Sequence, residues 1–184
     1  MYLNGSIDVL HAPELLKDAQ KAVDILTEKI AQHKKMRIIG DYDIDGVTAT
    51  YILLKGFKRL GANVDTYIPD RVADGYGIHD HLIKKAMEDG IDTIVTCDNG
   101  ISASSQITYA KELGMTVVVT DHHEVPFTDT EEGRTYILPP ADAIINPKQA
   151  DCTYPNKNIC GAVVAMKLVF ALYEKYRLPE EEKE

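Results

Sequence analysis

MRIIGDYDIDGVTA, residues 36–49, places a cluster of carboxylates directly after an apolar run that ends at Gly40. Three aspartates then occupy every second position: Asp41, Asp43 and Asp45. Carboxylates this close repel one another, and a divalent cation relieves the repulsion because Mg2+ and Mn2+ prefer oxygen ligands. A solvated acidic loop in which one aspartate caps the following helix explains the same residues. The stretch by itself therefore leaves a metal site and an acidic loop equally open.

The composition fits a single domain with a sizeable core, since 45% of the 184 residues are hydrophobic. No apolar run approaches the ~20 residues that span a bilayer, and no secretory signal is expected at the start. Cys97, Cys152 and Cys160 lack metal-binding spacing and predict reduced thiols in a cytoplasmic protein. The net charge of −9 argues against an extended nucleic-acid-binding face, but it allows a small site that holds phosphates through metal ions.

Helices and strands are expected to alternate along the chain. Pro13 and apolar residues at three- and four-residue spacing predict a first helix over 13–34. Strands are then predicted over 36–40, 63–68, 92–97, 115–120 and 142–145, and helices over 46–60, 78–89, 102–113 and 161–176. This alternation indicates an α/β fold, with a Rossmann-like parallel sheet of about five strands and helices on both faces. We expect an N-terminal arm and helix over 1–35, a catalytic domain over 36–178 and a solvated acidic tail over 179–184.

Polar residues gather at the carboxyl ends of three predicted strands. The aspartate cluster follows the first strand, Asp98 follows IVTC, and Asp121, His122 and His123 follow TVVVT. Ligands bind at this edge of open α/β sheets, so the three segments are expected to form one site. A donor set of Asp and His without Cys favours Mn2+ or Mg2+, and it can hold two ions ~3.5–4 Å apart. Such an ion pair activates water for attack on phosphorus, which predicts phosphoester hydrolysis.

Several of these residues also have a purely structural interpretation. The sequence DNG at 98–100 is by itself more typical of a turn that leads into a helix, and Asp121 can cap a turn. Arg71, in the loop PDRVADGYG, suits a phosphate oxygen and solvent equally well. Cys97 is expected in the core. The other histidines are expected at the surface: His11, His33, His79 and His81.

The stretches that carry the predicted chemistry, GDYDIDGVTA, TCDNGIS and VTDHHE, resemble the motifs of the DHH phosphoesterase superfamily. Within it they are most similar to the RecJ-type exonucleases, which degrade single-stranded DNA in the 5′→3′ direction. The loop YIPDRVADGYGI matches as well, as do LNGSIDVLHAPELLKDAQKAV and PPADAIINPKQADCTYPNKNICGAVVAMKL. The resemblance covers nearly the whole chain in the family's order, and it implies a metal-dependent phosphodiesterase.

The resemblance also implies a set of metal ligands. Asp43 and Asp45 would bind metal, with Asp41 in or beside the coordination sphere. Asp98 would bridge two Mn2+ or Mg2+ ions, and His122 would bind one of them.

The same resemblance implies how the substrate is held. His123 would contact the scissile phosphate as a catalytic residue, and Asp121 would orient or support the site. Arg71, Gly75 and Gly77 would line the nucleotide path. The implied partners are single-stranded DNA and proteins of DNA repair or replication, with no membrane.

The sequence departs from the RecJ pattern in two ways. RecJ-type proteins continue with a further metal-binding aspartate, a second domain called DHHA1 and usually an OB-fold, none of which is found in these 184 residues. We therefore expect an N-terminal fragment or a truncated gene product, with weak or no activity of its own. In addition, Val163 stands where a second glycine usually precedes the last helix.

Other functions are weighed against this one. A nano-RNase, cyclic-dinucleotide phosphodiesterase or family II pyrophosphatase would use the same chemistry, but these relatives usually carry a histidine at the position of Ile39. A non-catalytic scaffold related to RecJ would have lost acidic residues that this chain keeps. A plain nucleotide-binding module would carry a glycine-rich phosphate loop after its first strand, and this sequence has none there.

Overall fold

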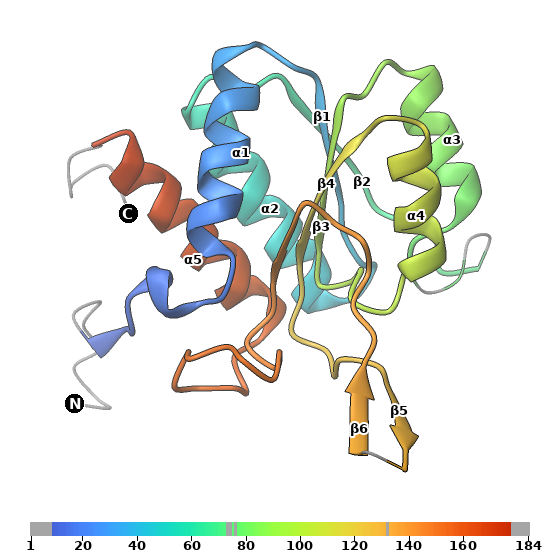
Figure 1. Ribbon diagram of the computed structural model, residues 1–184. Coiled ribbons are helices and arrows are strands. Elements are labelled where there is room, and N and C mark those ends of the chain that lie inside the picture. Colours follow the sequence, from blue (N-terminus) through green and yellow to red (C-terminus); the bar gives the residue numbers. More distant parts are fainter. Residues whose placement is uncertain (1–8, 73–74, 76, 132, 178–184) are drawn as a thin grey trace.

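A five-stranded parallel sheet forms the centre of the protein in the computed structural model, which describes residues 9–72, 75, 77–131 and 133–177 (Figure 1). The strand order is β2-β1-β3-β4-β7, and every neighbouring pair is parallel. The strands are β1 (Met36–Ile39), β2 (Val64–Tyr67), β3 (Thr93–Cys97), β4 (Thr116–Thr120) and β7 (Ala143–Ile145). The predicted α/β class and the parallel sheet are confirmed.

Helices cover both faces of this sheet. On one side lie α1 (Ala19–Ala31), α2 (Ile44–Arg59) and α5 (Gly161–Lys175), and on the other lie α3 (Asp80–Glu88) and α4 (Ser104–Glu112) (Figure 1). Side chains of a strand point alternately to the two faces, so Ile38 packs in the core under α1, α2 and α5, while Ile39 packs in the core under α3 and α4. Burial on both faces explains why the strand sequences are continuously apolar.

The predicted helix over 13–34 is interrupted. A short 3-10 helix, η2 (Pro13–Leu15), is followed by Asp18 with φ 60°, and α1 begins only at Ala19. The Asp18 carboxylate accepts a hydrogen bond from the Ile144 N–H, and Lys17 forms an ion pair with Asp151. These contacts with distant segments replace the helical hydrogen bonds that the local pattern predicts.

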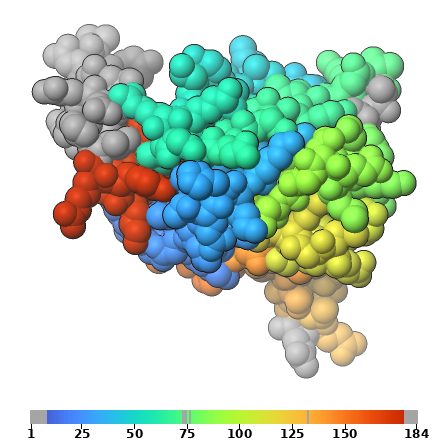
Figure 2. Space-filling model, turned by 90° about the horizontal axis from the view of Figure 1, so that it is seen from above, coloured from blue at the N-terminus to red at the C-terminus, as the bar shows by residue number. Residues whose placement is uncertain are grey.

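A two-stranded hairpin lies in a region where the sequence predicts only a loop. It consists of β5 (Phe127–Thr130) and β6 (Gly133–Tyr136), which are antiparallel, and all its described residues are exposed. In both Figure 1 and Figure 2 the hairpin projects beyond the rest of the molecule. A strand with no buried face produces no apolar alternation, so its sequence carried no strand signal.

Parts of the predicted domain boundaries lie outside the described residues. The start of the arm over 1–8 and the acidic tail over 179–184 are among them. Within the described residues, no helix has the length and apolar character required to cross a membrane.

Candidate metal centre

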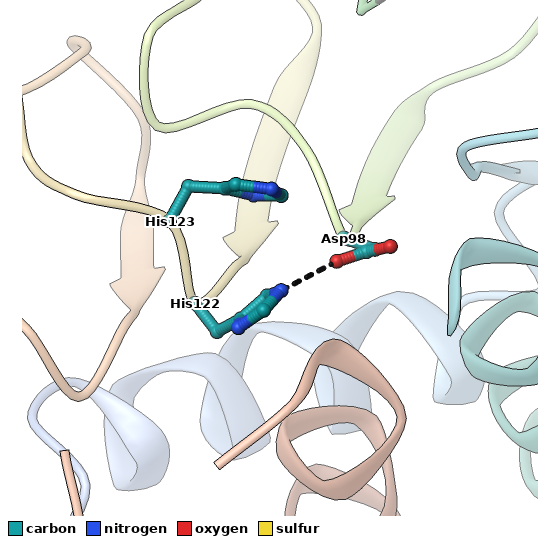
Figure 3. A group of neighbouring side chains, drawn as sticks. All are labelled: Asp98, His122 and His123. Carbon is teal, nitrogen blue, oxygen red and sulfur yellow. Dashed lines mark ion pairs between the residues drawn. The ribbon is translucent and has the colours of Figure 1, made fainter. Parts of the chain in front are cut away.

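The polar residues that follow β1, β3 and β4 meet at the carboxyl edge of the sheet. Figure 3 shows Asp98, His122 and His123 facing one another, and the distance from His122 Nε2 to Asp98 Oδ1 is 3.0 Å. Asp98 itself has φ 60° and is only 1% exposed. The structure therefore brings the second and third predicted segments together.

Two groups of side chains have the spacing of metal ligands. The first consists of Asp98, His122 and His123, and the second of Asp41, Asp43 and Asp98. In each group, one ligand atom from every member lies within 4.8 Å of the others. Asp98 belongs to both groups and therefore lies between two candidate ion positions.

The electrostatics of Asp98 suit a cation. Burial, followed by the neighbouring charges of Asp45 and Asp43, raises the pKa of Asp98 to about 8. Its Oδ1 makes no hydrogen bond within the described part of the chain, and its contact with His122 Nε2 is an ion pair. Burial also raises the pKa of Asp41. Oxygen-rich donors, an orphaned buried oxygen and mutual repulsion together fit Mn2+ or Mg2+.

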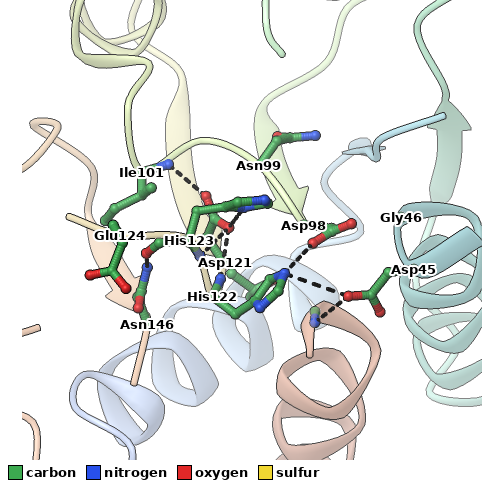
Figure 4. A network of polar contacts seen from close by, with 12 residues as sticks. Asp45, Gly46, Asp98, Asn99, Ile101, Asp121, His122, His123, Glu124 and Asn146 are labelled. Carbon is green, nitrogen blue, oxygen red and sulfur yellow. Dashed lines mark hydrogen bonds and ion pairs between the residues drawn. The ribbon is translucent and has the colours of Figure 1, made fainter. Parts of the chain in front are cut away.

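Asp45 lies beside these groups and binds the start of α5. Its Oδ2 accepts a hydrogen bond from the Gly161 N–H at 2.7 Å, and its Oδ1 accepts one from the Ala162 N–H at 2.8 Å. The same Oδ2 is 3.5 Å from His122 Nε2 (Figure 4). Asp45 belongs to neither ligand group within the described residues. Because a carboxylate has about four acceptor sites, these hydrogen bonds leave room for a metal.

Two glycines allow the backbone to approach the aspartates closely. A Cβ on Gly161 would lie 2.6 Å from Asp98 Oδ1, and a Cβ on Gly46 would lie 2.6 Å from the Asp41 Cβ and carbonyl oxygen. Asp43 is more exposed and caps α2 by accepting a hydrogen bond from the Gly46 N–H at 2.8 Å. Asp43 thus caps α2 and is also a member of the ligand group of Asp41, Asp43 and Asp98.

Asp121 is buried behind the histidines and organises their loop. Its Oδ2 accepts a hydrogen bond from the Ile101 N–H, and its Oδ1 accepts one from the His122 N–H. The distance from Asp121 Oδ1 to His123 Nδ1 is 2.7 Å, and this contact raises the pKa of His123. When Nδ1 of a neutral imidazole donates, Nε2 is the acceptor atom. Asp121 therefore fixes the orientation of the His123 ring.

Sequence reasoning missed two buried amides at this edge. The Asn146 side chain donates a hydrogen bond to the His123 carbonyl oxygen at 3.0 Å. Asn146 directly follows β7, so the rule that led to the other clusters applies to it as well. Asn99 is 1% exposed, and its Oδ1 has no hydrogen-bond partner within the described residues.

The glycine-rich loop after β2 lies next to the same edge. The Arg71 guanidinium is exposed and lies 5.5 Å from the ring centre of Tyr42, between the first two aspartates. Gly75 and Gly77 have φ values of 78° and 88°, which favour glycine. Gly77 also lines a pocket of about 220 Å3 that reaches His123.

Other polar residues singled out in the sequence lie as follows. Cys97 is buried, as predicted, with its Sγ 3.3 Å from the Thr50 hydroxyl. His11, His33 and His81 are exposed, as predicted. The prediction for His79 is wrong in part, because this side chain is half-buried and its Nε2 is fully covered.

Comparison with known proteins identifies the family. The model of the DHH family, N-terminal domain, matches residues 35–184. The single-stranded-DNA-specific exonuclease RecJ of Bacillus subtilis is 43% identical over 181 residues, covering 98% of this chain and 22% of that protein. RecJ of Escherichia coli is 40% identical over 158 residues, covering 85% of this chain and 26% of that protein.

Solved structures agree with the sequence match. The crystal structure of exonuclease RecJ bound to manganese has a TM-score of 0.77 at 35% identity, covering 89% of this chain and 39% of that chain. RecJ from Thermus thermophilus in complex with Mn2+ has a TM-score of 0.70 at 33% identity, covering 89% of this chain and 22% of that chain. This chain therefore spans well under half the length of these relatives. It belongs to the DHH family and contains the family's N-terminal domain.

Proposed function

We propose that this chain is the metal-binding catalytic domain of a RecJ-like 5′→3′ exonuclease that hydrolyses phosphodiester bonds in single-stranded DNA. The observation that carries the proposal is the buried Asp98 shared by two ligand groups. The substrate and the direction of hydrolysis come from the similarity to RecJ proteins, of which this chain covers only a part.

The ligand groups suggest how two ions, Mn2+ or Mg2+, would be held. Asp41, Asp43 and Asp98 would bind one ion, and Asp98 and His122 would bind the second, with Asp45 at its side. Ions bound there would supply positive charge that stabilises the phosphoryl oxygens and makes water more acidic. Asp98 would serve both ions, whose positive charge would offset the burial and the neighbouring carboxylates that raise its pKa.

The remaining residues would position the phosphate. The raised pKa of His123 favours its charged form, which suits contact with phosphate oxygens. Asp121 would keep the ring in place through its Nδ1. Arg71, with Gly75 and Gly77 in the same loop, would line the nucleotide path beside the centre.

The proposal also includes the cellular compartment of the protein and the class of its partners. Its three cysteines are free thiols, which suits the reducing cytoplasm. Proteins of DNA repair or replication are the partner class that a RecJ-like enzyme would meet there.

Calorimetric titration of the chain with Mn2+ tests the metal centre directly. We expect saturable binding that Asp98→Asn abolishes, because both ion positions lose a shared ligand. Asp24→Asn, on the exposed surface of α1, is the matched control and should bind like wild type. Wild-type protein that binds no Mn2+, or an Asp98→Asn variant with unchanged affinity, would contradict the proposal.

A further inference from the structure

The exposed face of α2 begins at the candidate metal centre and carries no acidic side chain. At 3.6 residues per turn, this face contains Ile44, Val47, Thr48, Tyr51, Lys55, Lys58 and Arg59. Ile44, Val47 and Tyr51 are 88%, 45% and 61% exposed, and their three- and four-residue spacing places them in one stripe along the helix. Such exposed apolar surface next to a candidate active site indicates a binding surface.

A groove runs along this face, between α2 and α5. Its volume is about 730 Å3, and no acidic residue lines it. Tyr51 and the three cations of α2 form one wall, and aromatic residues of α5, Phe170 and Tyr173, line the other. The two helices come close at Gly56, where a Cβ would lie 2.6 Å from Val169.

The charge of this face is opposite to that of the chain as a whole. The net charge is −9, yet the only acidic residue of α2 is Asp45, in its first turn. Lys55 and Lys58 are exposed and form no ion pair within the described residues. Arg59 lies 6.0 Å from the ring centre of Tyr173. Lys58 and Arg59 are adjacent in the sequence, and Lys55 lies three and four residues before them, which places it on the same side of the helix.

The spacing along α2 matches a short length of single strand. At 1.5 Å per residue, Lys55 and Lys58 lie about 15 and 20 Å along the axis from Asp45. That length accommodates roughly four to six nucleotides at the ~3.4 Å spacing of stacked bases. Proteins that bind single strands combine cations for the backbone with aromatic rings for the bases, and this face offers both.

We propose that the exposed face of α2, with its groove against α5, binds the single-stranded nucleic acid that leads away from the metal centre. Lys55, Lys58 and Arg59 bind the phosphates, and a base stacks on Tyr51. The proposal rests on the proposed function, because it takes the metal centre as the point where the strand is cut.

Fluorescence anisotropy with labelled dT12 in metal-free, low-salt buffer tests this surface without hydrolysis. We expect the double variant Lys55→Gln/Lys58→Gln to bind about tenfold more weakly, with a salt dependence shallower by about 1.4. Tyr51→Ala should weaken binding by roughly tenfold through lost stacking. The matched control is Lys21→Gln/Lys84→Gln, which removes two exposed cations from α1 and α3 and should stay within about twofold of wild type.

Three outcomes overturn the proposal. In the first, wild-type protein does not bind dT12, and in the second the α2 double variant loses no more affinity than the control. In the third, light scattering shows that wild type is a dimer and that Tyr51→Glu dissociates it, which assigns the face to a second copy of the chain. Mn2+ calorimetry on the same variants separates this surface from the proposed function. If the proposed function is wrong, wild type binds no Mn2+. If only the proposal for the α2 face is wrong, wild type and the α2 variants still bind Mn2+.

Discussion

Asp98 combines a buried carboxylate with a left-handed backbone, and both properties shape how it can be tested. Its φ of 60° is tolerated by Asn far better than by most residues, so Asp98→Asn removes the charge with little added strain. Its pKa is raised from 3.8 to about 8, which means that the metal-free folded state favours the neutral form. The stability of wild-type protein without metal should therefore fall as pH rises from about 4 to about 8.

The first prediction follows from this fall in stability with rising pH. In EDTA at pH 8, Asp98→Asn should raise the midpoint of thermal unfolding, by roughly 4–8 °C if about 2 kcal/mol of burial cost and carboxylate repulsion is removed. At pH 4 wild type and variant should unfold at the same temperature, because Asp98 is then neutral. Circular dichroism at both pH values measures this, with Asp24→Asn as control. A lower midpoint for Asp98→Asn at pH 8 would show that the ionised Asp98 carboxylate does not destabilise the fold.

Asp121 gives a second prediction at the residue scale. Its hydrogen bond is the largest cause of the raised pKa of His123, so Asp121→Asn should lower that pKa. NMR titration of the histidine ring protons reports the change, and the exposed His33 serves as an internal reference. In wild type the stability gained from this contact is present at low pH and is lost as pH rises through the pKa of His123. An unchanged titration of His123 would mean that Asp121 does not orient the ring.

The sequence predicted which polar residues meet at the sheet edge, but it did not determine what each carboxylate does. Polar residues at strand ends identified the aspartates and the two histidines, because a parallel sheet gathers such ends at one edge. The hydrogen bonds of Asp45 to α5 join positions 116 and 117 residues apart in the chain. No local pattern encodes a contact of that kind. The roles assigned to individual ligands therefore stay predictions.

At the scale of elements, the Asp45 carboxylate caps the N-terminus of α5. Asp45 accepts the first two N–H groups of α5, which have no partner inside the helix. Losing such a cap costs about 0.5–2 kcal/mol. Helices with a buried apolar face and strands buried on both sides were predictable to within a few residues. The hairpin and the break at Asp18 were not, because one lacks a buried face and the other depends on distant contacts.

The third prediction concerns this cap. Asp45→Ala should lower the free energy of unfolding by about 1 kcal/mol in urea at pH 5 with EDTA. At pH 5 Asp98 carries a proton, so relief of repulsion does not mask the lost cap. Asp45→Asn, which retains one acceptor oxygen, should fall between wild type and Asp45→Ala. Equal stability of all three proteins would show that α5 does not depend on Asp45.

At the scale of the whole molecule, the hairpin is separate from the two cores that hold the sheet. Its own contacts are local: Phe127 packs edge-on against Tyr136, and the Arg134 guanidinium lies 3.6 Å from the Phe127 ring centre. None of its residues belongs to either core. The stability of the domain should therefore be independent of it.

The fourth prediction tests that independence. Replacing residues 128–135 by two glycines should change the free energy of unfolding by no more than about 0.5 kcal/mol, the scale of surface substitutions. Thermal unfolding and Mn2+ calorimetry together check the fold and the proposed metal centre. Phe57→Ala, in the core under α1, α2 and α5, is the positive control and should cost about 3–5 kcal/mol. A large loss in the free energy of unfolding on hairpin deletion would show that β5 and β6 unfold cooperatively with the rest of the domain.

The bond between Asp45 and the start of α5 has a further consequence. A cation that binds the Asp45 carboxylate competes with the two N–H groups that donate to it. Binding of a ligand at the sheet edge and fraying of the first turn of α5 are therefore linked by one coupling free energy. Hydrogen exchange at Gly161 and Ala162 thereby becomes a reporter of what the edge has bound.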